Sequence, residues 1–117
     1  MRRYFRTKLA LYGLMMAIFM NVASVQEVVP GIRKVIGIDG RQIVLFNIEG
    51  RFYAIDDACP HQGAALSEGE LEGAWVVCPW HGACFDLATG IATRFPLAER
   101  LSTYEVRLDG DAIALVT

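Results

Sequence analysis

Short apolar runs separated by turn residues fill most of the chain after residue 20. Residues 33–38 and 41–46 flank Asp39-Gly40, a dipeptide that favours a two-residue hairpin turn. Apolar and polar positions alternate only in part, which is typical of strands buried on both faces, and no long stretch of helical periodicity follows residue 20. The pattern predicts an all-β fold, a small antiparallel β-sandwich. The predicted strands are residues 33–38, 41–46, 52–55, 74–77, 104–108 and 112–116.

Two connecting segments have a different character. Residues 66–73 are polar and rich in glycine, so we expect an exposed connection there. Residues 92–101 include Pro96 and are expected to be irregular.

Residues 1–20 differ from the rest of the chain. A basic start leads into an apolar run over residues 9–20, which is shorter than the ~20 residues of a membrane-spanning helix. Three interpretations stay open: a non-essential extension preceding a start at Met20, a membrane anchor, or an export signal with a twin-arginine character at Arg2-Arg3. We therefore predict a boundary between an extension, residues 1–20, and one domain, residues 21–117.

The charge distribution limits the kinds of partner. Residues 1–20 hold four basic and no acidic side chains, so the remainder has 7 basic residues against all 13 acidic ones, a net charge of −6. An acidic body argues against nucleic acid as a partner, because nucleic-acid binding requires a basic face.

The candidate chemistry lies in two short segments, Cys59-Pro60-His61 and Cys78-Pro79-Trp80-His81-Gly82. His61 and His81 are the only histidines of the chain, and sixteen residues separate His61 from Cys78. Thiolate and imidazole ligands suit iron–sulfur clusters or zinc. A Cys2His2 zinc finger places both cysteines on one arm, whereas here each arm has one cysteine and one histidine. That arrangement suits a [2Fe–2S] cluster with two thiolates on one iron and two imidazoles on the other.

This spacing, C-x-H followed after sixteen residues by C-x-x-H, resembles the Rieske proteins, and the resemblance covers residues 21–117. It implies one [2Fe–2S] cluster per chain, with Cys59 and Cys78 on the inner iron and His61 and His81 on the outer iron. The resemblance also implies that the two ligand loops lie at one end of the sandwich. Cys84, the third cysteine, is interpreted as a core residue, which leaves no pair for a disulfide and fits a reducing, cytoplasmic compartment.

The flanking residues separate two branches of the family. The high-potential branch has an additional cysteine in each loop, where this chain has Ala64 and Trp80, and hydroxyl side chains where it has Ala83 and Phe85. Fewer hydrogen bonds to the cluster sulfurs mean a lower potential. The chain thus resembles the low-potential ferredoxins of bacterial ring-hydroxylating dioxygenases.

Such ferredoxins accept electrons from a flavoprotein reductase that uses NAD(P)H and pass them to a terminal oxygenase. The resemblance therefore implies an electron carrier and not an enzyme, with membrane contact only through residues 1–20. Two alternatives stay open: a small Rieske-type subunit of a larger reductase such as a nitrite reductase, and a zinc-stabilised binding module.

Other residues near the ligands receive supporting roles. Gly63 and Gly82 are expected to let the backbone approach the cluster closely. The residues expected to shape and cover the loops are Pro60, Pro79 and Trp80. The acidic side chains expected to surround the electron exit and steer a basic partner are Asp56, Asp57, Glu68, Glu70 and Glu72.

Overall fold

The structure is a computed structural model that describes residues 6–12, 15–60, 63–80, 82–92 and 100–116. Ten strands and one turn of 3₁₀ helix are present in these ranges, and none of these residues forms an α-helix. The all-β prediction is therefore confirmed. The elements are β1 (Arg6–Tyr12), β2 (Met15–Ser24), β3 (Arg33–Ile38), β4 (Arg41–Ile48), β5 (Arg51–Asp56), η1 (Leu66–Glu68), β6 (Leu71–Glu72), β7 (Trp75–Val77), β8 (Cys84–Asp86), β9 (Thr103–Asp109) and β10 (Ala112–Val116).

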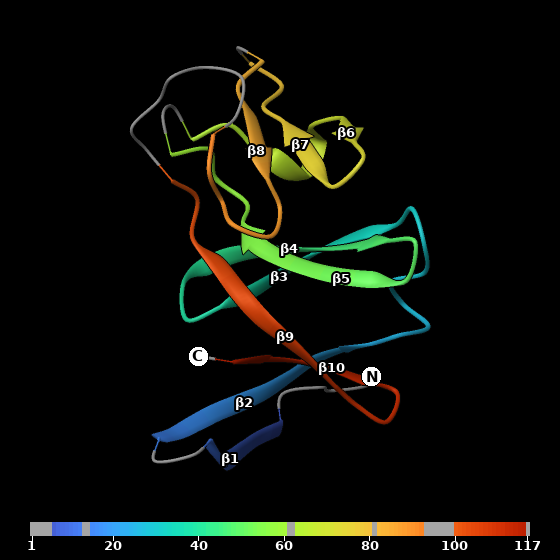
Figure 1. The fold of residues 1–117 in the computed structure, drawn as a ribbon, viewed down its shortest axis with the longest axis vertical. Helices are drawn as coiled ribbons and strands as arrows, with labels where there is room; N and C mark the ends of the chain where they lie inside the picture. The colour runs from blue at the N-terminus through green and yellow to red at the C-terminus, as the bar shows by residue number, and fades with distance from the viewer. Residues whose placement is uncertain (1–5, 13–14, 61–62, 81, 93–99, 117) are drawn as a thin grey trace.

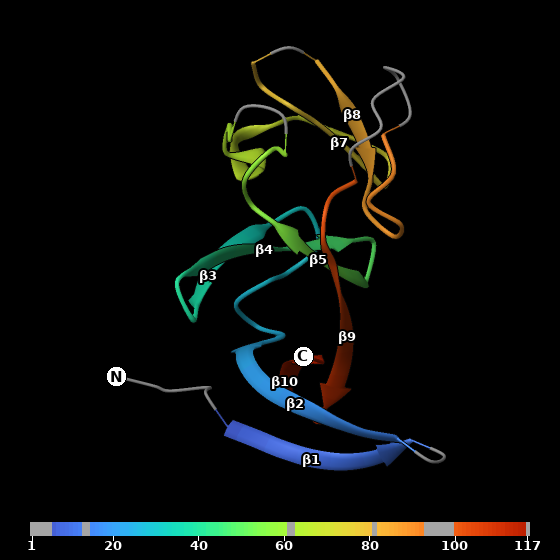
Figure 2. The same cartoon turned by 90° about the vertical axis from the view of Figure 1, so that its left-hand side faces the viewer.

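The strands form three layers, which Figures 1 and 2 show from two sides. Seven strands pair in the order β1-β2-β10-β9-β5-β4-β3, and β6-β7-β8 form a separate sheet above them. β5 and β9 pair at two positions only, Ala54 with Tyr104 and Ile55 with Thr103. The larger sheet turns at this junction, so β3, β4 and β5 form the middle layer, and β1, β2, β9 and β10 form the lower one.

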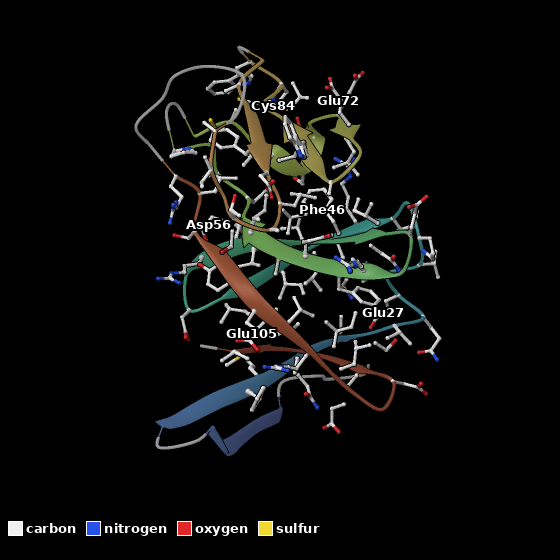
Figure 3. All side chains as sticks on the ribbon, in the orientation of Figure 1. Glu27, Phe46, Asp56, Glu72, Cys84 and Glu105 are labelled. Carbon is white, nitrogen blue, oxygen red and sulfur yellow. The ribbon has the colours of Figure 1, made fainter. Side chains whose placement is uncertain are left out.

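β4 explains why the apolar pattern alternates so poorly. Its residues 43–47 are all buried, because both faces of the strand are covered. Ile43 and Leu45 belong to the core between the middle and lower layers, whereas Val44 and Phe46 belong to the core beneath the three-stranded sheet. Figure 3 shows Phe46 between these two upper layers. The three-stranded sheet therefore packs against the middle layer.

The predicted hairpin turn at Asp39-Gly40 is present, and a second turn of the same kind joins β4 to β5. Asp39 and Gly40 have φ angles of 49° and 78°, and Glu49 and Gly50 have φ angles of 52° and 91°. Positive φ at both central residues of a two-residue loop matches the right-handed twist of the flanking strands. These turns fix the register of β3, β4 and β5.

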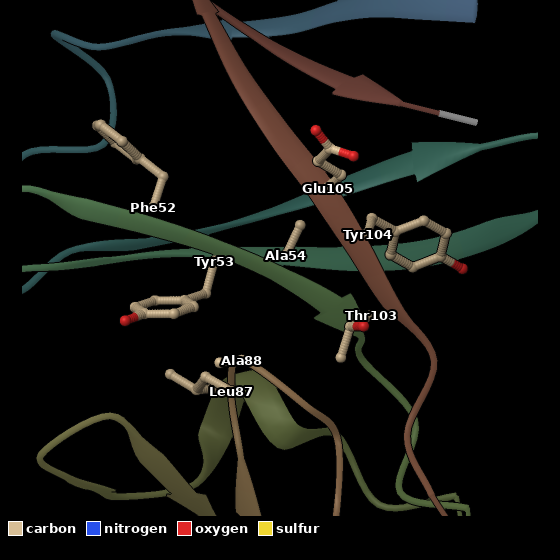
Figure 4. A pocket seen from close by; sticks show the side chains of 8 residues that line it. All are labelled: Phe52, Tyr53, Ala54, Leu87, Ala88, Thr103, Tyr104 and Glu105. Carbon is tan, nitrogen blue, oxygen red and sulfur yellow. The ribbon is translucent and has the colours of Figure 1, made fainter. Parts of the chain in front are cut away.

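A hollow of about 360 Å³ opens where β5 and β9 diverge (Figure 4). Tyr53 on β5 points toward Leu87 and Ala88 of the upper layer, whereas Phe52 points away from them. Phe52 packs against the lower core and Tyr53 against the upper one. Alternate side chains of one strand thus contribute to the two cores.

Residues 6–12 and 15–20 are strand in the structure. β1 pairs with β2, and β2 pairs with β10 from Phe19 opposite Val116 to Ser24 opposite Ala112. β2 therefore crosses the predicted boundary at residue 20. No helix in the described ranges is long and apolar enough to cross a lipid bilayer.

A chain that starts at Met20 is expected to fold and to keep its metal centre. Met20 to Ser24 still pair with β10, and Val22 and Ala23 still fill the core. A chain that starts at Val25 lacks this strand and should lose at least ~3 kcal/mol of unfolding free energy. Denaturant midpoints and iron content of the two truncated chains measure this difference. Loss of iron from the Met20 chain would show that the predicted boundary is wrong.

Candidate metal centre

The first ligand loop leaves β5 at Asp56 and closes on itself around Cys59. The amide of Cys59 donates a hydrogen bond to the carbonyl of Ala64 at 2.8 Å, and the amide of Gly63 donates one to the carbonyl of Cys59 at 2.7 Å. Ala58 and Ala65 form an antiparallel bridge at the base of the loop. These hydrogen bonds thus fix the backbone of Cys59 at the base of the loop.

The second loop, between β7 and β8, repeats this framework. The amide of Cys78 donates to the carbonyl of Ala83 at 2.7 Å, and the amide of Gly82 donates to the carbonyl of Cys78 at 3.1 Å. Val77 pairs with Cys84 at the base. The two loops therefore have the same backbone hydrogen-bonding pattern, and the cysteine occupies the equivalent position in each.

The repeated sequence explains the repeated shape. Both loops read Cys-Pro-x-x-Gly-Ala, and the two glycines, Gly63 and Gly82, have φ angles of 76° and 73°. This left-handed conformation favours glycine over residues with a side chain. The glycines are therefore required for the turn itself, a reason different from the close approach that the sequence suggested.

The thiol groups face the core of the upper layers. Cys59 and Cys78 are 2% and 1% exposed and belong to one apolar cluster with Ala64, Ala83 and Phe85. All three cysteines lie in described ranges, and none forms a disulfide. Cys84 is fully buried on β8 (Figure 3), where its backbone pairs with Val77. Its place agrees with the interpretation of a core residue.

The two histidines predicted as ligands, His61 and His81, lie outside the described residues. In the sequence they follow Cys59 and Cys78 by two and three residues. Among the residues that are described, no group of three or more His, Cys, Asp or Glu side chains is assembled that could hold a metal ion. The described ranges thus contain the thiolate half of the predicted ligand set.

A hydrogen-bonded chain fixes the start of the first loop. The hydroxyl of Tyr104 donates to Asp56 Oδ1 at 2.6 Å, and Arg41 donates to the same hydroxyl at 2.9 Å. Burial and the hydrogen bond to Asp56 raise the pKa of Tyr104 above its ordinary value. Tyr104 therefore stays a neutral donor that ties β9 to the last residue of β5.

Asp57 is not the surface acid that the sequence suggested. Its residue is 9% exposed, and its carboxylate accepts hydrogen bonds from the backbone amide and the hydroxyl of Ser67. Asp56 is half-buried against Tyr104. Only Glu68, Glu70 and Glu72 of the predicted acidic group are exposed.

The connection between the loops also differs from expectation. Leu66 is fully buried in η1, and Gly69 is buried behind it. Glu68, Glu70, Glu72 and Gly73 are exposed as expected, whereas the burial of Leu66 and Gly69 makes part of the segment a packed element. Sequence reasoning missed it because its polar composition hides one buried leucine and one buried glycine.

The outer surface of the loops is apolar and open to solvent. Pro60, Pro79 and Trp80 are all exposed, and Trp80 is 64% exposed. Beside the second loop lies a surface hollow of about 400 Å³, lined by Glu68, Gly69, Glu70, Val77, Cys78, Pro79 and Gly82.

Comparison with known families identifies this arrangement. The sequence profile described as "Rieske [2Fe-2S] domain" matches residues 18–105, most of the chain. The chain belongs to the Rieske [2Fe–2S] domain family. Family membership implies a [2Fe–2S] cluster, and the two loops that contain Cys59 and Cys78 lie within the matched residues.

Individual relatives within the Rieske family are ferredoxins. The chain is 31% identical over 97 residues to the ferredoxin component of the naphthalene 1,2-dioxygenase system of Pseudomonas aeruginosa, covering 83% of this chain and 93% of the relative. It is 51% identical over 72 residues to the 3-phenylpropionate/cinnamic acid dioxygenase ferredoxin subunit of Shigella flexneri, covering 61% and 68%. The protein is an electron-transfer ferredoxin and not itself an enzyme.

Solved structures agree with the fold. The ferredoxin in a complex of reduced oxygenase and oxidised ferredoxin of carbazole 1,9a-dioxygenase superposes with a TM-score of 0.75 at 28% identity, covering 82% of this chain and 99% of that one. A putative nitrite reductase small subunit superposes with a TM-score of 0.73 at 23% identity, covering 85% and 98%. The second likeness shows the shared fold alone, so the nitrite reductase alternative is the less supported one.

Proposed function

We propose that this Rieske ferredoxin holds one [2Fe–2S] cluster between its two loops. Cys59 and Cys78 would ligate the inner iron, and His61 and His81 the outer one. The observation that supports this ligand set is the repeated loop framework, which presents two buried thiols in equivalent backbone positions. In each loop the sequence places the histidine between the cysteine and the left-handed glycine.

The donor set fits the group chemically. Two thiolates and two imidazoles match the mixed ligation of a Rieske centre, which takes up and gives up a single electron. The described residues exclude water from the thiolate side, because Cys59 and Cys78 are buried among alanine and phenylalanine side chains. On the solvent side of the loops, Pro60, Pro79 and Trp80 are exposed, so a partner protein can contact them.

We infer that the carrier accepts its electron from a flavoprotein reductase that uses NAD(P)H and delivers it to a terminal oxygenase. Relatives named as dioxygenase ferredoxin components support this direction of transfer. We place the protein in the cytoplasm, where NAD(P)H is available and where buried thiols without disulfides are usual. Cell fractionation of the full chain tests this location.

The cluster itself is the first quantity to measure. Anaerobically purified protein is expected to be red-brown, to contain two irons and two sulfides per chain, and to give a rhombic electron paramagnetic resonance (EPR) signal when reduced. A colourless protein with one tightly bound zinc would contradict the proposal. Reduction by a dioxygenase-type flavoprotein reductase with NADH or NADPH then tests the direction of transfer.

Electron uptake from the reductase is expected to slow as ionic strength rises. Glu68 and Glu70 line the hollow beside Cys78, and Glu72 is exposed on the adjoining strand β6, so the acids flank the loop surface. Such charges accelerate association with a basic partner, and salt screens them over ~8–10 Å. The triple variant E68Q/E70Q/E72Q should be reduced more slowly at low salt and should lose most of the salt dependence.

A matched variant separates this local effect from total charge. E49Q/E105Q/D111N also removes three exposed acids, but these lie in the middle and lower layers, away from the loops. Stopped-flow reduction rates between low and high salt should follow the wild type for this control. Equal rates for the loop variant and the wild type at every ionic strength would show that the three glutamates do not steer the partner.

A further inference from the structure

Residues 66–70 contact the base of the first ligand loop. The amide of Ser67 donates to Asp57 Oδ1 at 2.6 Å, and its hydroxyl donates to Asp57 Oδ2 at 3.1 Å. The amide of Leu66 donates to the backbone carbonyl of Asp57 at 2.6 Å. Because Asp57 precedes Cys59 by two residues, these three hydrogen bonds fix the backbone at the start of the first loop.

The same segment contacts the base of the second loop. The amide of Val77 donates to the carbonyl of Glu70 at 2.8 Å. Gly69 lies so close to β7 that a Cβ atom at this position would be 2.0 Å from the carbonyl oxygen of Val77. Since Val77 directly precedes Cys78, the backbone at residues 69–70 determines how near β7 comes to the first loop.

Arg33 fastens this segment to the middle layer. One terminal nitrogen of its guanidinium donates to the carbonyls of Ser67 and Gly69, at 2.9 and 2.5 Å. The guanidinium carbon lies 5.1 Å from the centroid of the Phe46 ring, a cation–π contact. Arg33 therefore links η1 to β3 and to the centre of β4.

We propose that residues 66–70 form a brace that sets the separation of the two ligand loops, with Arg33 as its anchor. The proposal rests on the ligand set proposed above, in which one cluster takes ligands from both loops. Metal–ligand distances tolerate deviations of only about 0.2 Å, so supporting residues must hold the two halves of such a site in register. Asp57, Ser67, Gly69 and Arg33 are thus positioning residues for electron transfer.

Gly69→Ala is the most direct test of the brace. The added methyl group cannot fit 2.0 Å from a backbone carbonyl, so β7 must move away from the brace and carry Cys78 with it. We expect at least a tenfold loss of bound iron, with the β-sheet circular dichroism retained by the seven-stranded sheet. Gly37→Ala is the matched control, because a Cβ atom there meets nothing closer than 3.7 Å. Wild-type iron content and EPR g-values in Gly69→Ala would overturn the proposal.

Two substitutions of Arg33 test the brace without a steric clash. Arg33→Met keeps an apolar side chain over Phe46 but removes both donors, and we expect several-fold faster iron release to a chelator and a broadened EPR signal. Arg33→Lys should restore both properties at least in part, because a single ammonium group has three donors and can reach both carbonyls, as one nitrogen of Arg33 does. If Arg33→Met lowers the thermal midpoint but leaves the rate of iron release and the EPR g-values unchanged, Arg33 contributes only to packing and the proposal is refuted. An absence of iron in the wild type would instead refute the ligand set.

Discussion

Replacing any one of Cys59, His61, Cys78 and His81 by alanine is expected to abolish the assembled [2Fe–2S] cluster. Each substitution removes one of four protein ligands, and the two cysteine changes also leave a space in a core that the loops enclose. The iron and sulfide content of the purified variants, together with loss of the visible absorption, measures the effect. We expect less than a tenth of the wild-type iron in each variant.

Cys84→Ser is the matched control for the cysteine variants. Cys84 is as buried as Cys59 and Cys78, so the replacement also changes a fully buried cysteine, but one that is not a proposed ligand. Its place on β8 beyond the loop leads us to expect wild-type iron content with a modest loss of thermal stability. A cluster that survives Cys59→Ala or Cys78→Ala, or one that is lost in Cys84→Ser, would contradict the assignment of ligands.

The hairpins were predictable because their signals are local. Asp39-Gly40 determines a turn through its own backbone preferences, and no distant residue is needed to form it. The spacing of the cysteines and histidines was equally informative, since four ligand residues in one pattern constrain the chemistry strongly. The all-β class and the positions of the two loops that contain the proposed ligands followed from these two kinds of local information.

The brace was not predictable because distant contacts create it. Arg33 precedes Ser67 by 34 residues, and nothing in the local sequence of β3 marks it as a partner of the loop connection. The polar composition around Leu66 and Gly69 suggests exposure, whereas tertiary packing buries both residues. Asp57 reads as a surface acid for the same reason.

The reduction potential is expected near the lower end of the Rieske range, which extends from about −150 to +300 mV. Hydrogen bonds to the cluster sulfurs stabilise the reduced, more negative state and so raise the potential. Ala83 and Phe85 are fully buried beside the thiol groups and have no hydroxyl to donate. The structure also has no disulfide between the loops.

Phe85→Tyr is expected to raise the midpoint potential. Phe85 belongs to the same group of buried core residues as Cys59 and Cys78. A hydroxyl on its ring would therefore lie in the environment of the sulfur atoms of the [2Fe–2S] cluster. If the new hydrogen bond stabilises the reduced state by about 1.4 kcal/mol more than the oxidised state, the midpoint rises by ~59 mV for one electron. Phe52→Tyr is the control, because Phe52 points away from the upper layer toward the lower core (Figure 4). Spectroelectrochemical titration at neutral pH should show an upward shift for Phe85→Tyr alone, and a wild-type midpoint well above zero would refute the low-potential assignment.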